Sequence, residues 1–288
     1  MRFAVDIPNI GGFGSQGGDF ADPHFVAELA HEAEESGWDG FFIWDHIGAD
    51  WPVALADPWL LLAAVALRTT ALKLGPMVTP LPRRRPWKLA RESVTLDHLS
   101  RGRLILGVGI GGGAEYSSFG EPSDDRAHGA MLDEGLSVLR GLWSGEPFSY
   151  AGAHYQLANV HFLPKPVQAQ IPVWVAGIWP RKKPFRRAAA WDGVFPLESG
   201  LSFTQQMSPA RIREALDYVQ AHRPAGAGAY DLVHWGITAG DDPGADRALV
   251  EPYQAAGVTW WLENFNNERG SIAEQRARIR KGPPRLGH

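Results

Sequence analysis

The sequence predicts a (β/α)₈ TIM barrel, formed by one domain over residues 1–288. Two observations carry this prediction. Short apolar runs alternate with helix-like segments along the chain, and eight such strand–helix units can be counted. The runs are rich in Val, Ile, Leu, Phe and Trp and do not alternate with polar residues, which is typical of parallel strands buried on both faces. No change in composition marks a second domain.

The first half of the chain contains four of these units. The expected strands are 2–7, 40–44, 72–78 and 103–108, and the helices that follow them are 22–36, 57–69, 86–98 and 124–142. Asp22 and Asp57 are suitable N-caps, and each precedes a proline that suits the first helical turn.

The alternation of strands and helices is interrupted at about 143–170, where the sequence predicts a hairpin followed by a Pro-rich excursion. Four further units come after it. Their expected strands are 171–175, 193–195, 231–238 and 258–262, and their expected helices are 184–190, 209–222, 245–256 and 271–280.

Composition excludes several classes of protein. A hydrophobic share of 44% is too high for a disordered chain, and the lack of Cys excludes disulfides, thiolate zinc sites and iron–sulfur clusters. A net charge of −4 gives no basic field for nucleic acid, and we expect the basic run 83–85 to be a solvated helix start. The N-terminus has no signal-like apolar region, and the longest apolar stretch, 58–67, is about half a membrane span. We therefore expect a soluble, cytoplasmic protein without membrane or nucleic-acid partners.

In such a barrel the chemistry lies at the C-terminal ends of the strands. Asp45 and His46 end the second predicted strand, and a carboxylate beside an imidazole can transfer protons near neutral pH. The alternative is a capping Asp and a buried, hydrogen-bonded His. Glu115, after the fourth strand, is a secondary candidate.

Tryptophans and glycines also gather at strand ends. Trp44, Trp51, Trp179 and Trp235 are either core residues or the wall of an aromatic pocket; Trp51 and Trp179 fall in expected loops, which favours the pocket. Gly177, before three cations, marks either an anion site or an exposed basic helix start.

Two stretches match G-x-G-x-x-G: Gly12, Gly14 and Gly17, and Gly107, Gly109 and Gly112. The first lies too far from its strand and helix for a dinucleotide fingerprint, and no helix is expected directly after the second. We interpret these glycines as letting the backbone approach a flat ligand. The sequence contains no G-x-S-x-G, Walker A or H-E-x-x-H motif and no metal-ligand spacing, so no metal site is predicted.

Longer motifs identify a family resemblance. The block T-L-D-H-L-S-R-G-R followed by L-G-V-G is specific, and it resembles the bacterial luciferase-like family of flavin and deazaflavin oxidoreductases. Segments across nearly the whole chain share the resemblance: Ala33–His46, Leu74–Pro86, Leu89–Gly111, Leu132–Pro147, Leu163–Gln168 and Ile171–Gly177.

The resemblance implies a barrel with a cofactor ring at its C-terminal mouth. It implies a non-proline cis peptide after the third strand, at Met77–Val78 or Val78–Thr79, and a phosphate-binding segment at Gly177, Ile178 and Trp179. The expected cofactor-binding residues are Asp6, Met77, Val78, Thr79, Gly107, Gly109, Gly177, Ile178 and Trp179.

The family divides by cofactor. One branch uses reduced FMN and dioxygen for oxygenation, and the other uses coenzyme F420 for hydride transfer. Asp45-His46 matches a pair in F420-dependent sugar-phosphate dehydrogenases, but the acidic residue of those enzymes after the fourth strand falls here on 111–113, which are glycines. That departure argues against sugar-phosphate oxidation.

The first expectation is therefore a flavin-dependent monooxygenase that acts on a small organic substrate held by Trp44, Trp51 and Trp235. Asp45, His46 and Glu115 are its expected catalytic residues. The alternatives are F420-dependent hydride transfer, a non-catalytic flavin- or ligand-binding barrel, and a metal-dependent hydrolase. The resemblance also implies a homodimer, and FMN chemistry would need a separate flavin reductase.

Overall fold

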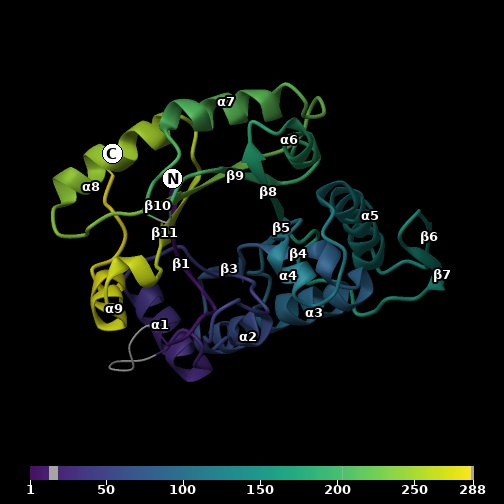
Figure 1. Cartoon of the computed structure of the whole chain (residues 1–288), viewed down its shortest axis with the longest axis horizontal. Coiled ribbons are helices and arrows are strands. Elements are labelled where there is room, and N and C mark those ends of the chain that lie inside the picture. Colours follow the sequence, from purple (N-terminus) through teal and green to yellow (C-terminus); the bar gives the residue numbers. More distant parts are fainter. Residues whose placement is uncertain (13–18, 203, 287–288) are drawn as a thin grey trace.

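The eight predicted strand–helix units form a (β/α)₈ barrel. The structure is a computed structural model, and it describes residues 1–12, 19–202 and 204–286. The parallel strands alternate with helices that surround them (Figure 1). The barrel strands are β1 (Arg2–Ile7), β2 (Gly40–Ile43), β3 (Lys73–Pro76) with β4 (Thr79–Pro80), β5 (Leu106–Gly109), β8 (Val173–Trp179), β9 (Gly193–Glu198), β10 (Asp231–Gly236) and β11 (Trp260–Asn264).

The sheet closes into a ring at the third barrel strand, which consists of β3 and β4. Its strand order is β3-β2-β1-β11-β10-β9-β8-β5-β4, so the first strand pairs with the last. β3 and β4 are two halves of one barrel strand, interrupted at Met77 and Val78. A parallel bridge between Leu74 and Leu104 joins β3 to the segment that leads into β5, which completes the ring.

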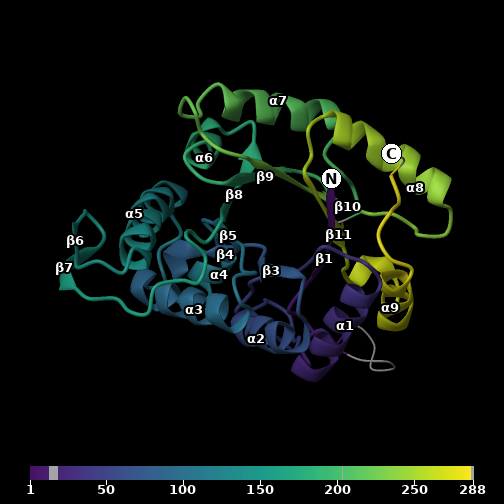
Figure 2. The ribbon, with the colours of Figure 1, turned by 180° about the vertical axis from the view of Figure 1, so that it is seen from behind.

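Helices cover the outside of the ring on all sides, and the view from behind shows the same arrangement (Figure 2). The covering helices are α1 (Pro23–Glu35), α2 (Pro58–Arg68), α3 (Pro86–Leu99), α5 (Asp125–Trp143), α6 (Lys182–Ala188), α7 (Pro209–Gln220), α8 (Pro243–Ala255) and α9 (Ile272–Arg280). Short helices lie in the loops: η1 (Leu81–Arg83), α4 (Ala114–Ser117) and η2 (Asn267–Arg269). None of the helices in the described ranges is both long enough and apolar enough to span a bilayer.

Local chemistry explains the helix boundaries. The side chains of Asp22 and Asp57 accept backbone N–H groups at the starts of α1 and α2, as the sequence predicts. The end of α2 is satisfied by the buried guanidinium of Arg103, which donates to the carbonyls of Ala66 and Thr69 at 2.9 Å. Arg103 thereby ties α2 to the strand that closes the ring.

Two layers of apolar side chains stabilise the barrel. The larger cluster lies between the strands and the helices, and a smaller one fills the barrel interior. In the interior, Trp174 and Trp260 lie with ring centroids 5.3 Å apart, and Phe42 packs against both. The interior is therefore a packed core, and any ligand site must lie at one end of the barrel.

The excursion at 143–170 contains the predicted hairpin. Strands β6 (Phe148–Ala151) and β7 (Gln156–Val160) pair antiparallel and project beyond α5 (Figure 1). The segment that returns to the barrel is held by Asp97, whose Oδ2 accepts the amides of Val167 and Gln168 at 2.8 and 3.0 Å.

Three details differ from the expectations. The third strand is broken in two, because the backbone bulges inward at Met77 and Val78. The strand predicted over 103–108 is continuous only from Leu106, and Leu104 before it forms an isolated bridge to Leu74. A one-turn helix, α4, opens directly after the second glycine motif, where no helix was expected.

Candidate active site

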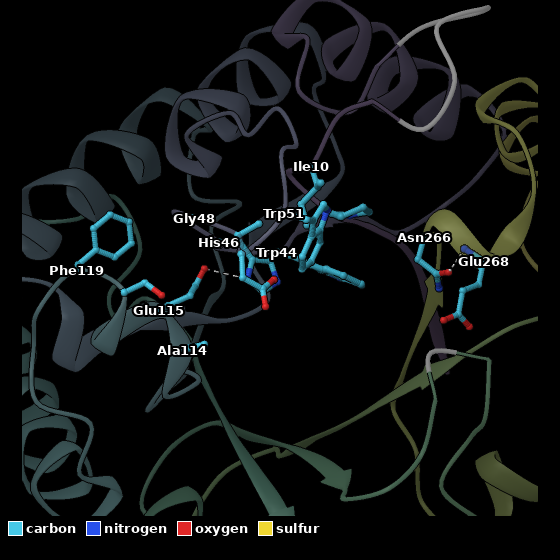
Figure 3. Close-up of a pocket in the computed structure, with 14 residues that line it drawn as sticks. Ile10, Trp44, His46, Gly48, Trp51, Ala114, Glu115, Phe119, Asn266 and Glu268 are labelled. Atoms are coloured by element: carbon cyan, nitrogen blue, oxygen red, sulfur yellow. Dashed lines mark hydrogen bonds and ion pairs between the residues drawn. The ribbon is translucent and has the colours of Figure 1, made fainter.

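A cavity of about 370 Å³ lies at the C-terminal end of the barrel. Its walls come from the loops that follow β1, β2 and β11 and from α4 with its flanking residues, and Figure 3 shows the side chains that line it. This is the end of the barrel at which the sequence predicts the chemistry.

His46 and Glu115 meet at the wall of this cavity. His46 follows β2 and Glu115 belongs to α4, and the structure places His46 Nδ1 3.1 Å from Glu115 Oε1 (Figure 3). The backbone N–H of Ile47 donates to the same oxygen at 3.0 Å, and Arg83 Nη1 donates to Oε2. The carboxylate of Glu115 is therefore fixed from both sides.

The surroundings of Glu115 keep it ionised. Burial alone would raise its pKa, but the bond with His46, the charge of Arg83 and the amide of Ile47 outweigh burial and hold the pKa below its ordinary value. The ionised carboxylate of Glu115 accepts a hydrogen bond from Nδ1 of His46, so Nδ1 is the ring nitrogen that carries the proton. The other ring nitrogen, Nε2, has no hydrogen-bond partner among the described residues, so it is the atom left for a ligand.

Asp45 lies on the opposite side of the chain from His46. Its buried carboxylate accepts from Thr79 Oγ1 at 2.6 Å, from Arg83 Nη2 at 2.5 Å and from Arg84 Nη2 at 2.9 Å. Trp59 Nε1 donates to it as well, at 3.4 Å. These donors occupy the acceptor positions of the carboxylate, so Asp45 orients the two arginines beside it. Of the pair, His46 lines the cavity and Asp45 does not.

The expectation that the basic run 83–85 is a solvated helix start was wrong for its first two members. The side chains of Arg83 and Arg84 are 5% and 15% exposed. Arg83 bridges Asp45 and Glu115, and Arg84 pairs with Asp45. Sequence reasoning missed this because both carboxylates come from distant units of the barrel.

Asn9 is a site residue that sequence reasoning missed. It is fully buried, its Nδ2 donates to the carbonyls of His46 and Ala56 at 2.7 Å, and its Oδ1 accepts the amide of His46 at 3.2 Å. This contact fixes the backbone that carries the imidazole. The available signal was a polar amide directly after the first strand, the position at which barrel enzymes place site residues.

Asp6 lies below the mouth, inside the barrel. Its Oδ2 accepts the indole N–H groups of Trp44 and Trp235 at 2.8 and 2.7 Å, and its buried Oδ1 has no hydrogen-bond partner in the part of the chain that the structure describes. Burial raises the pKa of Asp6 to about 8, and the two indole bonds offset burial only in part. Asp6 thus holds together two of the three predicted pocket tryptophans, whose rings lie 5.3 Å apart.

The three predicted pocket tryptophans have different surroundings. Trp44 and Trp51 line the cavity, and Trp51 is more than half exposed at its rim (Figure 3). Trp235 packs on the interior cluster and is half-buried. The expectation that Trp179 lies in a pocket loop was wrong, because it is the last residue of β8 and packs against Phe185 of α6.

The floor of the mouth is apolar. The peptide bond between Met77 and Val78 is cis, at the first of the two positions that the resemblance implies. Val78, Ala176, Leu197 and Trp235 are half-buried and pack on the interior cluster from four different strand units. Thr79, in contrast, is fully buried and bonded to Asp45. An apolar floor of this kind fits the flat ring of a flavin or deazaflavin.

The predicted ligand-facing glycines have other neighbours. A Cβ atom on Gly107 would lie 2.9 Å from Met77 Sδ and closer still to the carbonyl of Pro76, and one on Gly109 would lie 3.0 Å from Val78 Cγ2. These glycines make room for the bulge at Met77 and Val78. Gly14 and Gly17 of the first motif lie outside the described residues.

The predicted phosphate segment is part of a strand. Gly177, Ile178 and Trp179 pair with β9, and a Cβ on Gly177 would lie 2.5 Å from Pro184 Cβ. Gly177 therefore provides space for α6 on the outside of the barrel. Among the described residues, no group of three or more His, Asp or Glu side chains is arranged to hold a metal ion.

The parallel barrel, with an apolar floor and an imidazole–carboxylate pair at its C-terminal mouth, places the protein in the (β/α)₈ class. The chain belongs to the luciferase-like monooxygenase family, whose model matches residues 1–230. It is 31% identical over 204 residues to an F420-dependent glucose-6-phosphate dehydrogenase of Amycolatopsis mediterranei, a match that covers 65% of this chain and 58% of that protein. The chain thus spans less than two thirds of that relative's length.

Two solved structures show the same fold. The F420-dependent tetrahydromethanopterin reductase of Methanopyrus kandleri matches with a TM-score of 0.76 at 17% identity, over 97% of both chains. The oxygenating component of 3,6-diketocamphane monooxygenase from Pseudomonas putida, in complex with FMN, matches with a TM-score of 0.65 at 18% identity, over 97% of this chain and 84% of that one. An F420-dependent enzyme and an FMN-binding enzyme thus share this architecture.

Proposed function

We propose that the protein is an F420-dependent oxidoreductase that transfers hydride between the deazaflavin and a small organic substrate. The observation that carries the proposal is the pairing of His46 Nδ1 with the ionised Glu115 at the cavity wall. From the sequence alone, oxygenation is the first expectation. The pair favours hydride transfer, because oxidation of an alcohol needs a base at the hydroxyl while hydride leaves the adjacent carbon.

The residues of the mouth have separate roles in this proposal. The chemistry that F420 supplies when bound is two-electron hydride exchange. Val78, Ala176, Leu197 and Trp235 would hold its ring. His46 Nε2 takes the hydroxyl proton of an alcohol substrate, or returns it to a carbonyl in the reverse direction. Glu115 fixes the tautomer and orientation of His46 and stabilises the imidazolium, and Arg83 with Asp45 holds Glu115 in place.

The resemblance to sugar-phosphate dehydrogenases gains support at one point. The dehydrogenases have an acidic residue where this sequence has the glycines 111–113. In the structure, α4 brings the nearby acid Glu115 into contact with His46. The curated relative of this chain that we describe above is also named as F420-dependent.

The test combines cofactor binding with a matched pair of variants. F420 binding is followed by tryptophan fluorescence, and turnover by the absorbance of F420 with a panel of alcohols. We expect His46→Gln to bind F420 as the wild type does and to lower kcat by about 10²–10⁴-fold, the usual contribution of a general base. His161→Gln, on the exposed segment after the hairpin, is the control and keeps full turnover. Full turnover by His46→Gln overturns the role of His46.

Oxygenation with reduced FMN is the second candidate. The apolar wall of the cavity, with Ile10, Trp51 and Phe119, favours it because such a wall excludes water from a reactive cofactor. Tight binding of FMN with weak binding of F420, together with substrate-dependent oxygen consumption, would establish this candidate, and a separate flavin reductase would then be needed. Cofactor binding without turnover of any substrate would instead indicate a non-catalytic barrel.

We further propose a cytoplasmic homodimer. Support for the dimer comes from large apolar side chains on the outer surface, where Leu60 and Leu67 of α2 are 70% and 73% exposed and Trp87 of α3 is 40% exposed. Sedimentation equilibrium should give twice the chain mass of 31.5 kDa.

A further inference from the structure

Among the described residues, the cavity wall carries no lysine or arginine side chain that could balance the charge of an anion. Apart from His46, its ionisable side chains in the described residues are Asp50, Glu115 and Glu268. Residues 13–18, outside the described ranges, contain no Lys or Arg in the sequence. A phosphate or carboxylate in this cavity would therefore face carboxylates without a compensating cation.

The nearby cations are already engaged. Arg83 is bound to Asp45 and Glu115, as described above. Arg269, behind the last strand, contacts Glu263 Oε1 at 2.5 Å and donates to the carbonyl of Asn264 at 2.7 Å. Turning either guanidinium toward a ligand would take a cation away from a buried carboxylate, which is unfavourable.

One neutral donor belongs to the cavity wall. Asn266 lines the cavity and is 1% exposed, and its buried Nδ2 has no hydrogen-bond partner among the described residues (Figure 3). Its Oδ1 accepts the amide of Glu268 at 2.8 Å, which fixes the side chain. A buried amide N–H₂ without a partner is unfavourable, so an oxygen atom of a ligand would satisfy it.

The remaining wall is apolar. Ile10, Trp44, Trp51 and Phe119 come from three separate loops, and Phe119 stacks over Gly48, at which a Cβ would lie 3.0 Å from Phe119 Cζ. A volume of about 370 Å³ accommodates one small ring or a short branched chain.

From these observations we infer that the substrate is a small, uncharged alcohol or the corresponding carbonyl compound, with an apolar body, and that this site rejects phosphorylated and carboxylated compounds. The inference rests on the proposed function. The reacting oxygen meets His46 Nε2, an oxygen of the ligand accepts from Asn266 Nδ2, and the apolar body lies among the tryptophans and Phe119. Asp50 and Glu268 at the rim repel anions.

The test compares matched ligands. Cyclohexanol and 4-hydroxycyclohexanecarboxylate differ by one charged group and both keep the hydroxyl, and glucose 6-phosphate serves as a phosphorylated probe. Binding is measured by tryptophan fluorescence with and without oxidised F420, and hydride transfer is measured separately. We expect wild-type protein to bind cyclohexanol at least about tenfold more tightly than either anion, since one unfavourable charge contact at a partly buried site is enough for that factor.

A charge reversal at the rim tests whether Glu268 is responsible for the repulsion of anions. Glu268→Lys should improve binding of 4-hydroxycyclohexanecarboxylate by about tenfold or more and change cyclohexanol binding little. Glu251→Lys, on the exposed face of α8, makes the same change in net charge and should leave both affinities unchanged.

The outcomes separate the two proposals. Selective binding of the neutral alcohol without reduction of F420 supports this inference and contradicts the proposed function. Wild-type binding of either anion as tightly as cyclohexanol overturns the inference, whether or not hydride transfer occurs. Failure of cyclohexanol to bind, or of Glu268→Lys to improve anion binding, also counts against it.

Discussion

Asp45 and His46 are neighbours in the chain, and their side chains have opposite surroundings. His46 faces the cavity with a 41% exposed side chain, whereas the side chain of Asp45 is fully buried among two guanidinium groups, a hydroxyl and an indole. The sequence assigns proton transfer to the two residues jointly. In the proposed function their roles differ: His46 transfers the proton, and Asp45 stabilises the loop.

The substitution Asp45→Asn tests this division. It removes the carboxylate charge that Arg83 and Arg84 share, so we expect unfolding free energy to fall by about 3–5 kcal/mol, as for other broken buried pairs. Below the unfolding transition, kcat should stay within about tenfold of wild type, in contrast to the general-base loss at His46. Urea denaturation and steady-state kinetics measure the two effects. A kcat loss as large as that of His46→Gln, with unchanged stability, would place Asp45 in the chemistry.

The candidate residues could be chosen from the sequence, but their contacts could not. His46 and Glu115 were candidates because both follow predicted strands. Their contact depends on α4, a single turn without a periodic signal, and on Arg83, whose partners lie 38 and 32 positions away in the chain. Asn9 was missed because a lone amide has no motif, and its role appears only when it meets the backbone of His46.

At the scale of elements, the glycines in the fourth barrel strand explain how the third strand can bulge. Gly107 and Gly109 in β5 leave the space that Met77 and Val78 occupy. The same motif continues to Gly112, where a Cβ would meet no atom of the described residues within 4 Å. A glycine required by packing and one in open space thus lie five residues apart.

This contrast gives a matched pair of variants. Gly107→Ala forces a methyl group against Pro76 and Met77, and we expect a loss of about 1–3 kcal/mol of unfolding free energy, the typical cost of overpacking. Gly112→Ala should leave stability unchanged within about 0.5 kcal/mol, as is usual for substitutions in open space. Guanidinium titrations of both proteins measure the difference. Equal stability of the two variants would show that the bulge does not depend on Gly107.

Most elements were predictable, because every barrel strand is a short apolar run and most helices begin with an Asp or Ser cap. The boundaries that moved have tertiary causes. β8 and β9 extend past their apolar runs since they pair with each other as far as Trp179 and Glu198. Long-range pairing of this kind leaves no local signal in the sequence.

At the scale of the whole molecule, one buried histidine links stability to pH. His234 in β10 stacks on Tyr253 with ring centroids 4.3 Å apart, and burial lowers its pKa to about 3. In the unfolded chain the pKa of a histidine is about 6.5. As the pH falls below 6.5, His234 becomes protonated in the unfolded chain but stays neutral in the folded protein. Protonation therefore stabilises the unfolded chain, and the unfolding free energy falls between about pH 6.5 and pH 3.

We expect this histidine to lower the unfolding free energy by about 2 kcal/mol at pH 5 relative to neutral pH. His234→Phe keeps a ring against Tyr253 and removes the titration, so its stability should fall less over the same interval. Chemical denaturation of both proteins at pH 7 and pH 5 measures the difference. Parallel losses in the two proteins would exclude His234 as the source.

The closure of the ring has a consequence for how the chain reaches its native state. β1 finds its second neighbour only when β11, near the other end of the chain, is available. Until then both β1 and β10 present unpaired edges rich in apolar residues. Contacts of such long sequence separation slow folding, and open edges invite association between chains. During synthesis on the ribosome, the nascent barrel should therefore depend on chaperones until its last strand emerges.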